Sequence, residues 1–299
     1  MRDQSGGNGG QDFARPAIAV AVVIGLAAAT VAGFWWARRG QSALATTSQH
    51  APKTPVPPVY AIPPDHFGML APGSRLPTTS ECTALVRPRP FIENKAVNTS
   101  FNQATGHALA HDFFDPRSTD PRANSAVGVR VDGDFTGTTH EILRWTACKW
   151  GIDEDIVYAQ AAKESWWRQN SMGDWHPDAS ACAPGHGLGA DGRPGQCPQS
   201  FGILQDRYPF QHSSWPGIER STAMNADTAY ATWRACFEGY ERWLNTLDRG
   251  REYGAGDAWG CVGRWVSGRW HTAQGEQYAA GVQDYERRRV WEQRDFVEL

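Results

Sequence analysis

The stretch that decides the fold runs from residue 138 to residue 167 and reads TTHEILRWTACKWGIDEDIVYAQAAKESWW. Its first half predicts a helix beginning at Thr138, because Thr138 and Glu141 have the spacing of a capping box and apolar residues follow at helical spacing. Gly151 is predicted to end that helix, since glycine readily adopts the left-handed conformation found after helices. A second helix is predicted to follow Asp153, whose carboxylate can cap the first turn, and to run to about Trp167.

Two further helical patterns follow this stretch. Apolar residues recur at helical spacing over about residues 226–247 and 275–293. Residues 171–200 hold Gly, Pro and Asp without periodicity, and residues 249–273 are rich in Gly and Trp, so both segments are expected to be irregular. Residues 138–299 are therefore predicted to form one mainly helical domain.

The N-terminal region has a different composition. Residues 1–15 are rich in Gly, Gln and Asp and are expected to be disordered. Residues 17–36 carry no charge, and 20 residues of helix span about 30 Å, the thickness of a bilayer core. We predict a transmembrane anchor over residues 16–37, with a cleaved secretory signal segment as the alternative. The length of the apolar run favours the anchor.

A proline-rich segment separates this predicted anchor from the domain. Ten of the 19 prolines fall between Pro52 and Pro90, so residues 38–80 are predicted to form an extended linker. Residues 81–137 are polar and turn-rich, and are expected to form an irregular arm packed on the domain. His107 and His111 are four residues apart and could share a helix face, but no third ligand is near, so no metal site is predicted.

Overall composition narrows the classes of function. The chain has 29 Lys and Arg against 32 Asp and Glu, and this net charge of −3 argues against a nucleic-acid-binding protein. Of the 14 tryptophans, twelve lie between Trp145 and Trp291 and none between residues 37 and 144. Such a concentration suits either a large aromatic core or a surface that stacks on sugar rings.

Six cysteines indicate disulfides and an oxidising compartment. No two of them form a C-x-x-C pair, so zinc-binding spacing is absent. Cys182 and Cys197 are expected to pair, since their spacing is short and local. The pairing of the other four is left open, with Cys82–Cys148 and Cys236–Cys261 as the preferred arrangement. The disulfides place the domain on the extracytoplasmic side of the predicted anchor.

Glu164 is the leading candidate for a catalytic residue. On a helix, Val157, Gln160 and Ala161 share its face, and two tryptophans follow it at once. Burial against such a face disfavours the charged carboxylate and raises its pKa, as a glycosidic general acid requires. The alternative is a glutamate that simply pairs with Lys163 or another cation.

Three motifs occur in order around this glutamate: AKESWW at 162–167, SFGILQ at 200–205, and Tyr278 followed by Val282. Together they resemble the catalytic domain of lytic transglycosylases of the soluble (SLT) type, which is related in fold to goose-type lysozymes. The resemblance covers about residues 138–290 and implies an α+β, lysozyme-like fold. The family's A-Y-N-A-G segment is replaced by YGAG at 253–256, and an insert with two cysteines precedes residue 200.

The resemblance implies a role for each matching residue. Glu164 matches the catalytic acid/base, and Ser165 a following serine of mainly structural importance. Ser200, Gly202 and Gln205 match the segment that lines the glycan groove, where the glycine permits close approach of the glycan and the glutamine supplies an amide. Tyr278 matches a tyrosine near the acid, with core packing of its ring as the alternative.

The function implied is cleavage of the β-1,4 bond between N-acetylmuramic acid and N-acetylglucosamine in peptidoglycan, with a 1,6-anhydro product and no cofactor or metal. The expected partners are glycan strands and, through the anchor, the cell membrane. An inverting hydrolase would need a second carboxylate to activate water, for which Asp174 and Asp178 are available. A non-catalytic glycan-binding module would bind sugars through tryptophans expected in loops. A structural scaffold would need neither a catalytic carboxylate nor these tryptophans. Those tryptophans are Trp175, Trp215, Trp259, Trp265 and Trp270.

Overall fold

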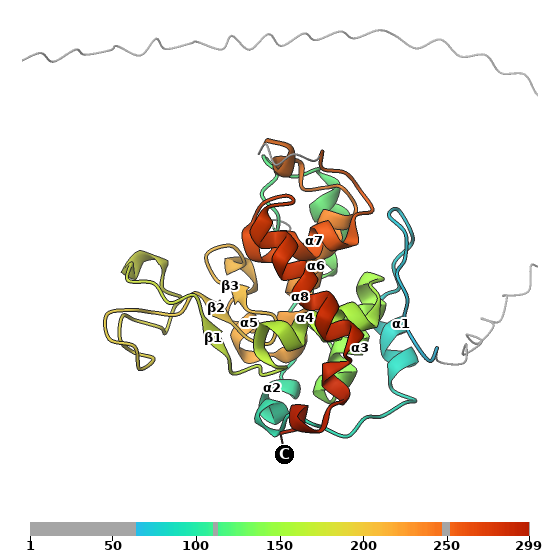
Figure 1. Cartoon of the computed structure of the whole chain (residues 1–299), viewed down its shortest axis with the longest axis horizontal. Helices are drawn as coiled ribbons and strands as arrows, with labels where there is room; N and C mark the ends of the chain where they lie inside the picture. The colour runs from blue at the N-terminus through green and yellow to red at the C-terminus, as the bar shows by residue number, and fades with distance from the viewer. Residues whose placement is uncertain (1–63, 110–112, 247–251, 299) are drawn as a thin grey trace, which may run out of the picture. The chain divides into compact units, whose positions relative to one another are not determined.

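Helices α3 (Thr139–Trp150) and α4 (Glu154–Ser165) form at the predicted places in the computed structural model, which describes residues 64–109, 113–246 and 252–298 (Figure 1). Thr138 and Glu141 cap α3 reciprocally, as predicted, and Gly151 ends it with a φ of 58°. Asp153 accepts a hydrogen bond from the backbone N–H of Asp155 at the start of α4. This helix ends two residues earlier than predicted, because Trp166 and Trp167 both have positive φ angles.

The described residues are mainly helical and share one hydrophobic core, as predicted. Three short strands form an antiparallel sheet in the order β1-β2-β3. The remaining helices are α1 (Thr79–Val86), α2 (Thr99–Asn102), α5 (Gly217–Arg220), α6 (Thr222–Phe237), α7 (Ala258–Ser267) and α8 (Ala273–Arg287), and the strands are β1 (Met172–Gly173), β2 (Ser200–Phe201) and β3 (Asp206–Arg207).

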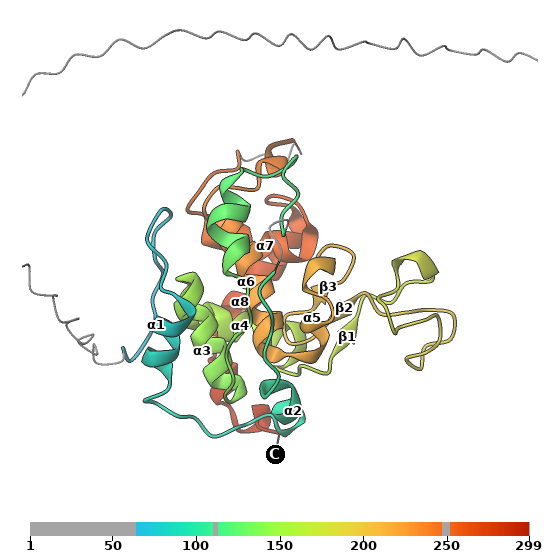
Figure 2. The same ribbon diagram turned by 180° about the vertical axis from the view of Figure 1, so that it is seen from behind.

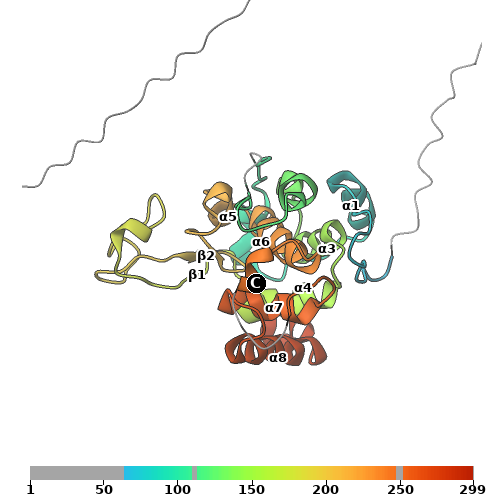
Figure 3. The same ribbon diagram turned by 90° about the horizontal axis from the view of Figure 1, so that it is seen from above.

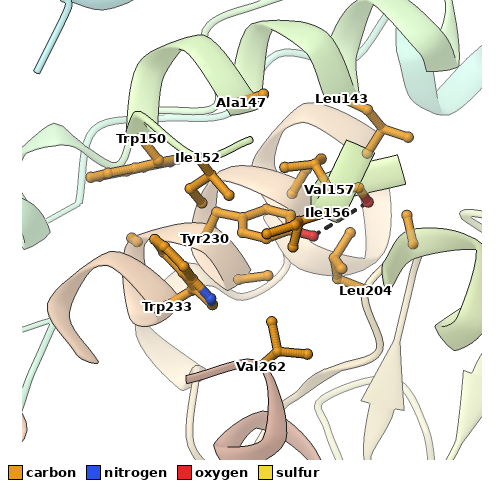
Figure 4. Close-up of a cluster of buried hydrophobic side chains, with 14 of the residues drawn as sticks. Leu143, Ala147, Trp150, Ile152, Ile156, Val157, Leu204, Tyr230, Trp233 and Val262 are labelled. Carbon is orange, nitrogen blue, oxygen red and sulfur yellow. Dashed lines mark hydrogen bonds between the residues drawn. The ribbon is translucent and has the colours of Figure 1, made fainter. Parts of the chain in front are cut away.

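The core forms where α3, α4 and α6 meet (Figure 4). Tyr230 of α6 is buried there, and its hydroxyl donates a hydrogen bond to the backbone carbonyl of Val157, 3.3 Å away. Beside it, the fully buried Asp227 accepts hydrogen bonds from Lys149 Nζ at 2.7 Å and Trp150 Nε1 at 2.8 Å. The hydrogen bond of Tyr230 thus ties α6 to α4, the helix that carries Glu164, and those of Asp227 tie α6 to α3.

Two further helices differ from their predicted bounds, and one helix was not predicted. Helix α8 spans Ala273–Arg287 rather than 275–293. Helix α6 spans Thr222–Phe237 rather than 226–247, because the chain turns at Gly239, which has a φ of 78°. Residues 258–267 form α7 although they were expected to be irregular. Its glycines serve packing, since a Cβ at Gly263 would lie 2.8 Å from the backbone oxygen of Gly275 on α8. Helices α7 and α8 therefore approach closely because both carry glycine at the crossing.

Three disulfides are present, and they follow the preferred pairing. Cys82–Cys148 joins α1 to α3, and Cys236–Cys261 joins α6 to α7. Cys182–Cys197 closes a loop within the segment between β1 and β2. Figures 1, 2 and 3 agree that this segment, in yellow-green, extends away from the helices on the side of the sheet.

The segment before α3 is more ordered and more closely packed than expected. Residues 81–137 contain most of α1, as well as α2 and short 3₁₀ and π turns, and they contribute Val86 and Val127 to the core. Residues 64–80, predicted to belong to the linker, also lie against the domain. Phe67 is buried, and the backbone N–H of Leu70 donates to the carbonyl of Gly151 at 3.0 Å.

Several predictions concern residues outside the described part of the chain. These are the disordered tail 1–15, the anchor 16–37, the linker up to residue 63, and His111. Among the helices that the structure describes, none combines the length and the apolar composition needed to cross a bilayer.

Candidate active site

Glu164 borders a cleft of about 650 Å³ that lies between the sheet on one side and α7 on the other. The wall on the sheet side comes from the segment that follows β1 and from the β3 region. The opposite wall comes from α7 and the start of α8. The lining residues are Glu164, Asp174, Gln205, Arg207, Phe210, Gln211, Trp243, Arg264, Trp265, Val266, Ser267, Gly268 and Gln274.

The Glu164 side chain is half-buried near the C-terminal end of α4. Burial raises its pKa from 4.5 to about 7, and the nearby charge of Asp174 acts in the same direction. The hydrogen bond from Tyr278 and the charge of Lys163 lower the pKa without cancelling this rise. A shift of this size corresponds to about 3 kcal/mol of differential interaction. Glu164 makes no salt bridge to Arg168, whose guanidinium pairs with Glu298 instead.

Tyr278 of α8 lies beside Glu164, as the resemblance implied, and its hydroxyl donates a hydrogen bond to Glu164 Oε1. The ring of Tyr278 also packs against the core, as the alternative expected. Its hydroxyl, however, points to Glu164. One turn before Glu164, Gln160 faces the Tyr278 hydroxyl and accepts a hydrogen bond from Tyr230 at 3.2 Å. The carboxyl of Glu164 is thus oriented by a short buried polar network.

The two serines of the motifs, Ser165 and Ser200, make hydrogen bonds that hold neighbouring parts of the site in place. Ser165 Oγ donates to the backbone carbonyl of Ile203 at 2.8 Å, and so ties the end of α4 to residues 200–205. Ser200 is buried, and its Oγ donates to Asp174 Oδ2 at 2.5 Å. Neither serine lines the cleft, so both position other groups.

Gly202 has a structural role that differs from the one expected. It is buried with a φ of 78°, and a Cβ there would lie 2.4 Å from Nδ2 of Asn225. It borders a smaller pocket and not the Glu164 cleft. Glycine is therefore required here by packing against α6. Gln205 does line the cleft, and its Nε2 donates to the carbonyl of Gly202 at 2.9 Å, which holds the amide against the wall.

Of the two aspartates considered for a hydrolase, only Asp174 lies in the cleft. Asp178 caps a short 3₁₀ turn by accepting from the backbone N–H of Ser180 at 2.9 Å. Asp174 has a φ of 49°, and its carboxylate is 57% exposed. The structure therefore brings the carboxyls of Glu164 and Asp174 into one cleft, where Ser200 holds that of Asp174.

The tryptophans expected in loops are distributed differently. Trp259 and Trp265 lie on α7, and Trp270 is buried. Trp215 packs against Phe201, and Trp175 lies 4.4 Å below the guanidinium of Arg193. Of these five, only Trp265 lines the cleft, and its Nε1 donates to the carbonyl of Leu204 at 3.2 Å.

Sequence reasoning missed most of the lining residues, and four of them have large aromatic or charged side chains: Arg207, Phe210, Trp243 and Arg264. Arg207 is only two residues beyond Gln205. This position next to the SFGILQ motif was the one sequence signal that could have placed it in the cleft. The other three come from segments that carry no recognisable motif. Arg264 lies with its guanidinium 5.4 Å from the ring of Trp243 and pairs with the buried Glu241.

One group in the described residues has ligand atoms close enough to share a metal ion: His66, Asp153 and Asp155. It lies at the start of α4, at the opposite end of that helix from Glu164.

Comparisons with protein-family models, with curated proteins and with solved structures found no match for this chain. Its function must therefore be inferred from the residues of the cleft.

Proposed function

We propose that the chain is a peptidoglycan-cleaving lytic transglycosylase with a lysozyme-like fold and Glu164 as its single acid/base. The observation that carries this proposal is the state of Glu164. It is a half-buried carboxyl with a pKa of about 7, oriented by Tyr278 at the edge of an open cleft. A carboxyl that is partly protonated near neutral pH can donate its proton in one step and accept one in the next.

In the first step, protonated Glu164 donates its proton to the oxygen of the glycosidic bond. The bond between that oxygen and the anomeric carbon breaks, and the sugar develops oxocarbenium character. In the second step, the Glu164 carboxylate accepts the proton of the muramoyl C6 hydroxyl, whose oxygen bonds to the anomeric carbon. The product is a 1,6-anhydro sugar, and Glu164 regains its starting proton.

The lining of the cleft suits a glycan strand. Trp265, Val266 and the 68% exposed Phe210 present apolar surface, on which sugar rings stack. Amide side chains at Gln205, Gln211 and Gln274 lie among them. Amides of this kind can pair with the hydroxyl and acetamido groups of amino sugars.

A lysozyme-type hydrolase is the second candidate, and Asp174 is the observation that favours it. Its carboxylate lines the same cleft as Glu164 and is fixed by the hydroxyl of Ser200. An inverting hydrolase needs such a second carboxylate to activate water. Its product would be heavier than the anhydro product by one water molecule and would have a reducing end.

The test is mass spectrometry of muropeptides released from purified sacculi. Wild-type protein should release anhydro products and Glu164→Gln should release none, while Glu252→Gln, a surface replacement of the same type, should behave as wild type. Hydrated products would establish the hydrolase instead. Normal release by Glu164→Gln would exclude Glu164 as the acid. If wild type binds sacculi and releases nothing, the chain is a glycan-binding module or scaffold.

The three disulfides support a place for this domain outside the cytoplasm. Together with the predicted segment 16–37, they lead us to propose a single-pass membrane protein with its catalytic domain on the extracytoplasmic side. If that segment is cleaved, the protein is secreted. Cell fractionation with mass measurement of the mature N-terminus separates the two forms.

A further inference from the structure

Arg207 lies on β3 in the same cleft as Glu164, and neither step of the proposed reaction uses it. We propose that Arg207 makes this cleft selective for glycans that carry a carboxylate, by pairing with that carboxylate when the strand binds. This inference rests on the proposed function, since it assumes that the Glu164 cleft binds a glycan.

The guanidinium of Arg207 is held in a fixed orientation. Its Nε and Nη2 donate to Oε1 of Gln199, at 3.1 and 2.5 Å. Gln199 is only 3% exposed and so provides a rigid anchor. On its other side the guanidinium lies 5.4 Å from the ring of Phe210. Because the anchor is a neutral amide, it orients the arginine without neutralising its charge.

The two arginines of the cleft differ in this respect. Arg264 donates two hydrogen bonds to the carboxylate of Glu241, which is 2% exposed, so its charge is neutralised within the protein. The carboxylate nearest to Arg207 is Asp174, at 3.8 Å from Nε. Asp174 is 57% exposed, and such a solvated pair contributes little energy.

Arg207 also has donors to offer. Its side chain is 42% exposed, and within the described residues its Nη1 donates no hydrogen bond. The Nη1 side of a guanidinium can bind a carboxylate through charge-assisted hydrogen bonds. An oriented, partly exposed guanidinium whose ion pair within the protein is solvated, in the same cleft as Glu164, is thus suited to an anionic part of the substrate.

The chemistry of peptidoglycan provides such a group. Each muramoyl residue carries a lactyl ether that ends in a free carboxylate when no stem peptide is attached. When a stem peptide is attached, the peptide brings carboxylates of its own. A β-1,4 polymer of N-acetylglucosamine has the same backbone and no carboxylate. The proposal therefore predicts discrimination between these strands, with either source of carboxylate.

The test measures binding in the Glu164→Gln background, where no strand is cleaved, by quenching of tryptophan fluorescence. Three soluble tetrasaccharides of equal length are compared: muramoyl strands with stem peptides, muramoyl strands without them, and a chitin oligomer. We expect the muramoyl strands to bind more tightly than the chitin oligomer. Arg207→Gln should reduce that preference about tenfold, the loss expected for about 1.4 kcal/mol of pairing. Arg288→Gln on the far end of α8 is the matched control.

A second variant separates charge from shape. Gln199→Glu keeps an acceptor for Arg207 in place but adds a negative charge, so it should also reduce the preference. Arg207→Lys, which retains the positive charge, should keep part of it, and the preference should fall as salt is added. Loss with peptide-free strands identifies the lactyl carboxylate, and loss only with peptide-bearing strands identifies the stem peptide.

Three results would overturn the proposal. These are equal affinity of the parent protein for all three oligomers, equal loss of affinity for all three in Arg207→Gln, and an unchanged preference in Gln199→Glu with a folded protein. Cleavage of sacculi by the wild type is measured separately. Cleavage without carboxylate preference would refute only the role of Arg207, whereas selective binding without cleavage would refute only the enzyme.

Discussion

Replacing Tyr278 by phenylalanine should raise the pKa of Glu164 above about 7. The Tyr278 hydroxyl donates a hydrogen bond to Glu164 Oε1, and this bond stabilises the ionised carboxylate. A hydrogen bond to a charged group contributes about 1.5–3 kcal/mol, and one pKa unit corresponds to 1.36 kcal/mol. Because Glu164 is only half-buried, we take the lower end and expect an upward shift of about one unit.

The assay is the pH dependence of kcat/KM for release of soluble muropeptides, measured from about pH 5 to about pH 9. The rate should fall as pH rises through the pKa of Glu164, since the first step needs its proton. In Tyr278→Phe this falling limb should lie about one unit higher than in the wild type. Tyr285→Phe is the control, because Tyr285 lies on the same helix but contacts Trp166. If the falling limb of the pH profile stays at the same pH in Tyr278→Phe or moves to lower pH, then this hydrogen bond does not lower the pKa of Glu164.

Three further predictions concern stability. Glu164→Gln should unfold at a higher urea concentration than the wild type at pH 8, and at nearly the same concentration at pH 4. The pKa of Glu164 is about 7 in the folded state and 4.5 in the unfolded state, so the wild type loses stability as pH rises from 4.5 to about 7. Asp206→Asn should likewise raise the urea midpoint at pH 8 more than at pH 4. Asp206 is fully buried, neither of its carboxylate oxygens has a hydrogen-bond partner, and burial raises its pKa. Equal urea midpoints of mutant and wild type at both pH values would contradict this prediction. Gly263→Ala should lower the melting temperature and cost about 1–3 kcal/mol, since its Cβ would press on the backbone of Gly275; an unchanged melting temperature would show that α7 can move.

Local signals were sufficient for α4, which carries Glu164, and for α3, which precedes it in the chain. The capping box of α3 and the Asp153 cap of α4 act within a few residues, so they can be read without knowledge of tertiary contacts. The proximity of Tyr278 to Glu164 joins residues 114 positions apart, and it was expected only because of the resemblance. The three disulfides likewise followed the preferred pairing, although spacing alone justified only Cys182–Cys197.

Predictions failed where tertiary contacts override local preference. Helix α7 contains Gly260 and Gly263, which disfavour a helix in isolation. In the structure these positions face Trp270 and the backbone of α8, and no larger side chain would fit. Gly202 is required by a tertiary contact as well, since a Cβ there would collide with Asn225 of α6. In each case the partner lies outside the element that carries the glycine, so neither propensity nor motif could identify it.

The tryptophans show how the fold supports the acid. Trp166 and Trp167 follow α4 with φ angles of 59° and 63°, a conformation that costs a residue with a side chain about 1–2 kcal/mol. Trp167 is fully buried, and its Nε1 donates to the carbonyl of Tyr158 at 2.9 Å. Burial of a side chain of this size offsets the backbone strain. The two residues therefore end α4 immediately after Glu164 and Ser165, so that the carboxyl meets the cleft.

Most tryptophans of the domain thus pack in the core, and those that reach the cleft are few. Trp145, Trp150, Trp167 and Trp270 are almost fully buried, whereas Trp265 borders the cleft together with Trp243. The aromatic excess of the sequence is mainly a property of the core that holds α4. That same core desolvates Glu164, so the packing that stabilises the domain also keeps its carboxyl partly protonated near neutral pH, where most carboxyls have lost their proton.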